Sequence, residues 1–168
     1  MKIGRGLKII LFILAAEMLG ASGSLVTSPA IAGWYKDLVK SPLNPPNWLF
    51  GPAWSILFAL MGISAFLIYE KGLKNKKVRE ALNIFIAQFI FNIAWSFIFF
   101  GAKLPKLALI EIVILWFLIL LTIVKFYRIS KTAGLILLPY LFWVTFATFL
   151  NWSVVVLNNF YGMQLGQR

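Results

Sequence analysis

The stretch that decides the fold, residues 34–54, reads WYKDLVKSPLNPPNWLFGPAW. It holds three Trp, four Pro and two Asn between two long apolar runs. Because proline fixes φ and lacks an amide donor, the connection is stiff. Trp and Tyr join a flat apolar body to one polar tip, which suits a membrane interface or a flat aromatic ligand. We expect a rigid aromatic lid over a pocket, followed by a helix with Asn44 as N-cap and Pro45 and Pro46 in its first turn.

The composition excludes several classes of protein and site. Hydrophobic residues make up 61% and charged residues 12% of the 168 positions, a balance far from that of soluble domains. There is no Cys and no His, which excludes disulfides, thiolate sites and His-ligated metal or haem. The acidic residues are too scattered for a catalytic dyad or a calcium loop: Glu17, Asp37, Glu70, Glu80 and Glu111. The sequence therefore predicts no metal site, no required cofactor and no visible acid-base machinery.

Five apolar segments each approach the roughly 20 residues needed to cross a bilayer. They cover about 9–31, 48–69, 81–100, 107–124 and 135–157, and no second domain or linker separates them. The sequence therefore predicts an all-α, polytopic membrane protein: one domain over residues 1–168, folded as a bundle of five transmembrane helices. An odd number of spans argues against a simply duplicated transporter.

The basic residues predict the orientation of these spans. Eleven of the 16 Lys and Arg fall at the N-terminus and in the connections after the second and fourth spans. The positive-inside rule places that side in the cytoplasm, with the C-terminus outside if the membrane is a plasma membrane. The net charge of +11 thus reflects topology, and we expect no nucleic-acid partner.

The first segment admits two interpretations. Its basic start, apolar run and small residues resemble a secretory signal peptide. We favour a retained helix, because Glu17 interrupts the apolar run and the segment is long enough to span. Small residues also recur every four positions, at Ala16, Gly20, Ser24 and Ser28. Such a ridge lets helices approach closely in lipid, either inside one chain or between two.

Polar and aromatic residues share faces of the third and fifth spans. Gln88 and Asn92 stand four residues apart, and amides at this depth must face a partner or a cavity. Interhelical hydrogen bonding and ligand contact are equally open interpretations. Trp143, Ala147 and Asn151 follow the same spacing, and the small Ala147 beside Trp143 leaves room for something flat.

Together these motifs resemble the TspO/translocator protein family of tryptophan-rich sensory proteins. The matching pieces occur in family order: Trp34-Tyr35, Asn44-Pro45-Pro46-Asn47-Trp48-Leu49-Phe50, Asn92-x-x-Trp95-Ser96, Pro139-Tyr140-x-x-Trp143 and Phe146-Ala147-Thr148-x-Leu150-Asn151-Trp152. The resemblance implies a homodimer of five-helix bundles in membrane lipid. It also implies a cavity, closed by the 32–47 loop, that binds porphyrins of the protoporphyrin type.

The resemblance also assigns residues to the cavity. It implies ligand contacts from Tyr35, Trp54, Asn92, Trp95, Trp143 and Ala147, with Trp48 and Phe50 near the mouth. The function expected is that of a tetrapyrrole-binding sensor or receptor. One alternative is a light-dependent porphyrin-degrading enzyme, in which Trp54 and Trp143 are the catalytic pair; the other is a transporter of porphyrins or lipids.

Two carboxyl groups in the spans receive no role from the sequence. Glu17 lies near the middle of the first span, and Glu111 lies about two turns beyond Lys103 and Lys106. Charged groups are expensive at bilayer depth. We expect Glu111 to snorkel or to lie in a crevice, or either residue to be a protonated or hydrogen-bonded acid.

Overall fold

The computed structural model describes residues 4–165, and side chains to residue 159. It confirms the all-α membrane fold. The helices are α1 (Arg5–Ala21), α2 (Ser24–Ala32), α3 (Trp34–Asp37), α4 (Asn47–Tyr69), α5 (Lys76–Ser96), the π-helical turn η1 (Phe97–Gly101), α6 (Pro105–Ile129), α7 (Lys131–Ile136) and α8 (Leu138–Leu165). Four spans are long and apolar enough to cross a membrane, and the pair α1 and α2 makes a fifth if it is counted as one.

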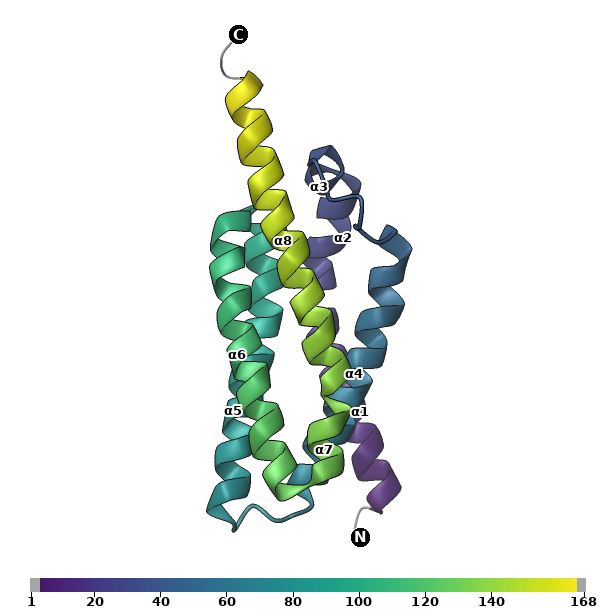
Figure 1. Cartoon of the computed structure of the whole chain (residues 1–168). Coiled ribbons are helices and arrows are strands. Elements are labelled where there is room, and N and C mark those ends of the chain that lie inside the picture. Colours follow the sequence, from purple (N-terminus) through teal and green to yellow (C-terminus); the bar gives the residue numbers. More distant parts are fainter. Residues whose placement is uncertain (1–3, 166–168) are drawn as a thin grey trace.

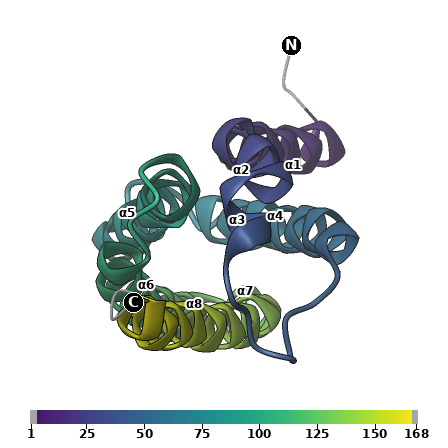
Figure 2. The same ribbon diagram turned by 90° about the horizontal axis from the view of Figure 1, so that it is seen from above.

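The helices run roughly parallel to one long axis (Figure 1). Seen from one end, α5 and α6 lie on one side, α4 and the α1–α2 pair on another, and α7 and α8 along the third (Figure 2). The 32–47 loop, which contains α3, lies at the end opposite the N-terminus. The basic 71–79 connection and the turn between α6 and α7 lie at the N-terminal end, as the charge pattern predicts.

The first span, predicted from the sequence as one helix over about residues 9–31, is bent by 42° between α1 and α2. At the bend, the Ser22 hydroxyl donates to the Leu19 carbonyl (2.6 Å). A Cβ at Gly23 would lie 3.0 Å from the Ser96 hydroxyl oxygen, so glycine lets α2 approach α5. The third span departs too, since it ends in η1, and the fifth is preceded by the short α7.

The small-residue ridge faces the inside of the bundle. A Cβ at Gly20 would overlap the ring of Phe58 on α4, and Ala16 is buried in the core. A similar approach occurs at Gly62, where a Cβ would lie 2.7 Å from the Ile13 Cα atom. Packing within the chain, one of the two interpretations of the ridge, is therefore observed for Ala16 and Gly20.

The predicted start of α4 is wrong by two residues. The helix begins at Asn47 after Pro46, and Asn44 does not cap it. Instead the Asn44 side chain accepts a hydrogen bond from the Tyr35 hydroxyl (2.8 Å). Pro45 favours an extended backbone because it precedes Pro46, and a residue before proline is disfavoured in the α region. The helix therefore does not begin at Pro45.

Candidate functional site: a cavity lined by tryptophan

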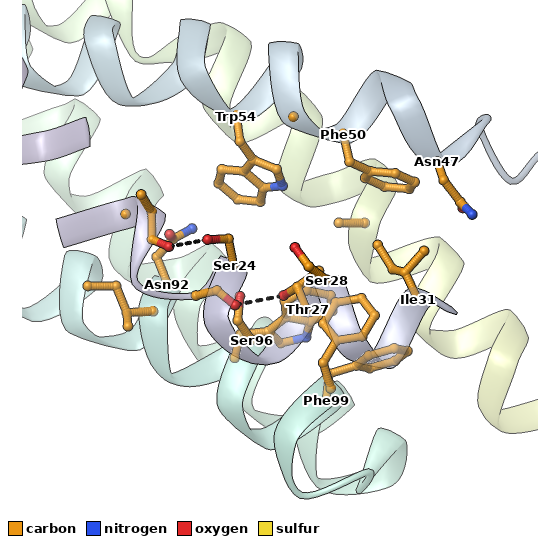
Figure 3. A pocket seen from close by; sticks show the side chains of 18 of the residues that line it. Ser24, Thr27, Ser28, Ile31, Asn47, Phe50, Trp54, Asn92, Ser96 and Phe99 are labelled. Atoms are coloured by element: carbon orange, nitrogen blue, oxygen red, sulfur yellow. Dashed lines mark hydrogen bonds between the residues drawn. The ribbon is translucent and has the colours of Figure 1, made fainter. Parts of the chain in front are cut away.

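One cavity of about 500 Å³ opens among α1, α2, α4, α5, η1 and α8, below the 32–47 loop. All eight residues assigned from the sequence lie along its wall: Tyr35, Trp48, Phe50, Trp54, Asn92, Trp95, Trp143 and Ala147. Figure 3 shows Phe50 and Trp54 projecting from α4 opposite Asn92, Ser96 and Phe99. The tertiary structure thus brings together residues up to 112 positions apart in the chain.

Trp54 and Trp143 belong to different helices and have different supports. The Trp54 ring stacks on Phe58, with centroids 5.3 Å apart. Trp143 meets Phe50 edge to face at 6.1 Å. Aromatic pairs in these arrangements hold their rings in place. Ala147 stands one turn after Trp143 and adds little bulk to the wall, so flat surface remains available beside the indole.

Asn92 connects the cavity to a buried hydrogen-bond network. Its amide nitrogen donates to the Tyr140 hydroxyl (3.0 Å), which in turn donates to the Gln88 amide oxygen (2.9 Å). Gln88 is 1% exposed and lies off the cavity wall. Of the two interpretations of this amide pair, interhelical hydrogen bonding applies to both residues. Asn92 alone also faces the cavity, where it could contact a ligand.

Trp95 and Asn151 hold a second part of the wall. The Trp95 indole nitrogen donates to the Asn151 side-chain oxygen (3.2 Å), and the Asn151 amide donates to the Pro105 carbonyl (2.8 Å). The Trp95 ring also stacks on Phe99 at 5.0 Å. These bonds tie α8 to α5 and to the start of α6. They also fix the orientation of the Trp95 ring in the cavity wall.

Glu111 does not snorkel, which excludes one of the alternatives that the sequence left open. It is 7% exposed on α6, and neither carboxyl oxygen has a hydrogen-bond partner among the described residues. The Gln88 side-chain nitrogen is likewise unpartnered there. Glu111 lies on the face of α6 that packs into the bundle, because Ala108, Ile112 and Leu115 around it are also buried.

The 32–47 loop is held by hydrogen bonds within itself and by one contact with α8. Tyr35 is buried, and burial raises the pKa of its hydroxyl while the bond to Asn44 lowers it. The Lys40 ammonium group donates to the Tyr35 carbonyl (2.7 Å) and lies 4.9 Å from the centre of its ring. On the other side, the Asn158 amide of α8 bonds the Val39 backbone twice, at 3.0 and 2.9 Å. The loop is therefore a held lid rather than a tether.

Sequence analysis missed the wall supplied by the first span. Glu17, Gly20, Ser24, Thr27, Ser28 and Ile31 all line the cavity. The signal was visible as the ridge of small residues at spacing four, which was assigned to helix packing alone. Asn151 was also left out, although it shares the face of Trp143 and Ala147.

Comparison with known proteins agrees with this architecture. The model of the TspO/MBR family matches residues 12–157. The chain is 42% identical to the tryptophan-rich protein TspO of Chlorobaculum tepidum over 139 residues, which cover 83% of this chain and 88% of the relative. It is 41% identical to the tryptophan-rich protein TspO of Archaeoglobus fulgidus over 152 residues, or 90% and 97% of the two chains. The human translocator protein is 36% identical over 122 residues, 72% of each chain. With the aromatic cavity and the helix order described above, these matches establish that the chain belongs to the TspO/MBR family.

Proposed function

We propose that the protein is a membrane sensor or receptor that binds a tetrapyrrole, of the protoporphyrin type, in the cavity below the 32–47 loop. The supporting observation is that four Trp residues from three elements surround one cavity of about 500 Å³. Known small-molecule sites are mostly apolar and measure about 300–1,000 Å³. Aromatic walls stack on a flat macrocycle, and Asn92 offers a polar contact within them.

Porphyrin titration of the purified protein tests this proposal. The porphyrin's own absorbance band should report binding, because loss of a Trp then leaves the signal intact. We expect Trp54→Phe/Trp143→Phe to weaken binding at least tenfold, since two stacking surfaces shrink. Trp152→Phe is the matched control, because Trp152 is half-exposed and off the cavity wall. Equal affinity in wild type and the double variant would contradict the assignment.

Light-dependent porphyrin breakdown is the second candidate, supported by the presence of both Trp54 and Trp143 in the lining of one cavity. In this reading the excited ligand and the indoles carry the chemistry, and the protein positions them. The expected result is a new absorbance product that forms under light and requires both Trp. If the same product forms equally from porphyrin in detergent without the protein, the enzymatic hypothesis is contradicted.

The orientation and assembly proposed are those expected from the sequence. Clustering of basic residues at the N-terminal end supports a cytoplasmic N-terminus and an outward-facing 32–47 loop. Protease access in sealed vesicles tests it. A homodimer is proposed on the family resemblance. Light scattering in mild detergent tests for the dimer, and a monomer at all concentrations would contradict this proposal.

Transport of porphyrins or lipids is the remaining alternative. Porphyrin accumulation in proteoliposomes above that of a Trp54→Ala control would support it.

A further inference from the structure

Glu17 is the only charged side chain among the described residues that line the cavity. It is half-buried on α1. The described hydrogen bonds and ion pairs do not include it; Arg5, on the same helix, pairs instead with Glu70 at 3.0 Å. An unpaired carboxyl group within a membrane span is costly and marks a functional site by default.

Glu17 belongs to the inner end of the cavity, away from the 32–47 loop. Along α1 and α2 the wall runs from Glu17 through Gly20 to Ile31, which is next to the loop. Gly20 touches the Phe58 ring, and Phe58 is likewise the innermost wall residue of α4. The carboxyl group therefore lies one turn of helix further in than this contact.

Other polar groups of the cavity wall offer acceptors. The Ser24 hydroxyl donates a hydrogen bond to the Ala21 carbonyl (2.6 Å), and the Thr27 hydroxyl donates one to the Gly23 carbonyl (2.9 Å). Their oxygens keep lone pairs for the cavity. Asn92 uses its amide nitrogen on Tyr140, which leaves its carbonyl oxygen as an acceptor. The donors that remain nearby include the neutral indole N–H groups of Trp54 and Trp143.

We infer that the inner end of the cavity recognises a positively charged or N–H-rich nitrogen group on an aromatic ligand, with Glu17 as the specificity-determining residue. The same carboxyl group repels a ligand carboxylate. A dicarboxylate porphyrin accordingly enters with its carboxylate-free edge inward and its carboxylates towards the 32–47 loop. This orientation rests on the proposed function, whereas the preference for nitrogen cations over carboxylates does not.

The test compares matched ligands on Glu17→Gln, which keeps the side-chain shape and removes the charge. The first pair is protoporphyrin and its derivative in which both carboxylates are converted to amides with terminal ammonium groups. The second pair is smaller: aminomethylpyrene and hydroxymethylpyrene. Glu80→Gln is the control, because Glu80 lies on the outer surface near Lys76 and Lys125. Thermal unfolding checks that both variants fold.

We expect Glu17→Gln to weaken binding of the ammonium member of each pair about tenfold or more, as for loss of a charge-assisted hydrogen bond. Binding of protoporphyrin should stay equal or improve, and Glu80→Gln should change neither. Equal weakening of both members, or no change in either, overturns the inference. If wild type binds no porphyrin but prefers the pyrene ammonium through Glu17, the proposed function fails and this inference stands. If wild type shows no preference within the pyrene pair, the inference fails.

Discussion

Replacing Tyr140 by Phe removes one hydroxyl group from the middle of the bundle and no carbon from its packing. Tyr140 is 1% exposed. Its hydroxyl donates to Gln88 at 2.9 Å and accepts from Asn92 at 3.0 Å. Because the Gln88 nitrogen has no other partner among the described residues, the substitution leaves that amide with no hydrogen bond on either side.

The expected cost follows from the two bonds lost. Hydrogen bonds between membrane helices average about 0.6 kcal/mol and reach about 1.7 kcal/mol each. Two bonds at a fully buried site therefore predict that the free energy of unfolding falls by about 1–3 kcal/mol, or roughly 5- to 150-fold in the unfolding equilibrium constant. Release of Asn92 should also weaken porphyrin binding, since its side chain loses the contact that orients it on the cavity wall.

Reversible unfolding in mixed detergent micelles, followed by circular dichroism, measures the first effect. Tyr127→Phe is the matched control, because Tyr127 is 43% exposed on α6. Gln88→Leu should cost less in the Tyr140→Phe background than alone, as expected for two residues that share a bond. If Tyr140→Phe unfolds like Tyr127→Phe, or if the two substitutions are additive, the network does not stabilise the bundle and the reasoning is refuted.

Three further outcomes follow from other contacts. Asn158→Ala should speed ligand dissociation in stopped flow several-fold by freeing Val39, whereas the exposed neighbour Asn159→Ala should not; equal rates would show that this clasp does not hold the lid. Gly62→Ala should lower the free energy of unfolding by about 1–3 kcal/mol, because its Cβ meets backbone, while Gly51→Ala has open space and should be tolerated; similar stability of the two would oppose the packing argument. Glu111→Met should unfold no more easily than wild type, since it removes two unpartnered buried oxygens; a marked loss in the same assay would mean that the carboxyl group has a stabilising partner.

Much of the cavity could be anticipated because its residues carry recognisable local patterns. The aromatic and proline-rich stretch from Trp34 to Trp54 predicted a stiff connection. The four-residue spacing of Trp143 and Ala147 predicted that they share one helix face. At the first span the same spacing indicated only a surface for another helix, and the cavity wall that Gly20 and Ser24 also form was missed. One periodicity serves both uses: Gly20 packs on Phe58 and also lines the cavity. A single sequence does not say what lies opposite a face.

The sequence by itself determined the class, the number of apolar segments and the polarity of the bundle's two ends, because bilayer thickness and loop charge act on short stretches of chain. Only the tertiary structure decided the contacts that join distant segments. It turned Asn44 from an expected helix cap into the partner of Tyr35, buried Glu111 instead of letting it snorkel, and placed Glu17 in the cavity. These outcomes depend on which helix lies opposite each side chain. That is set by the packing of the whole bundle, which no local pattern contains.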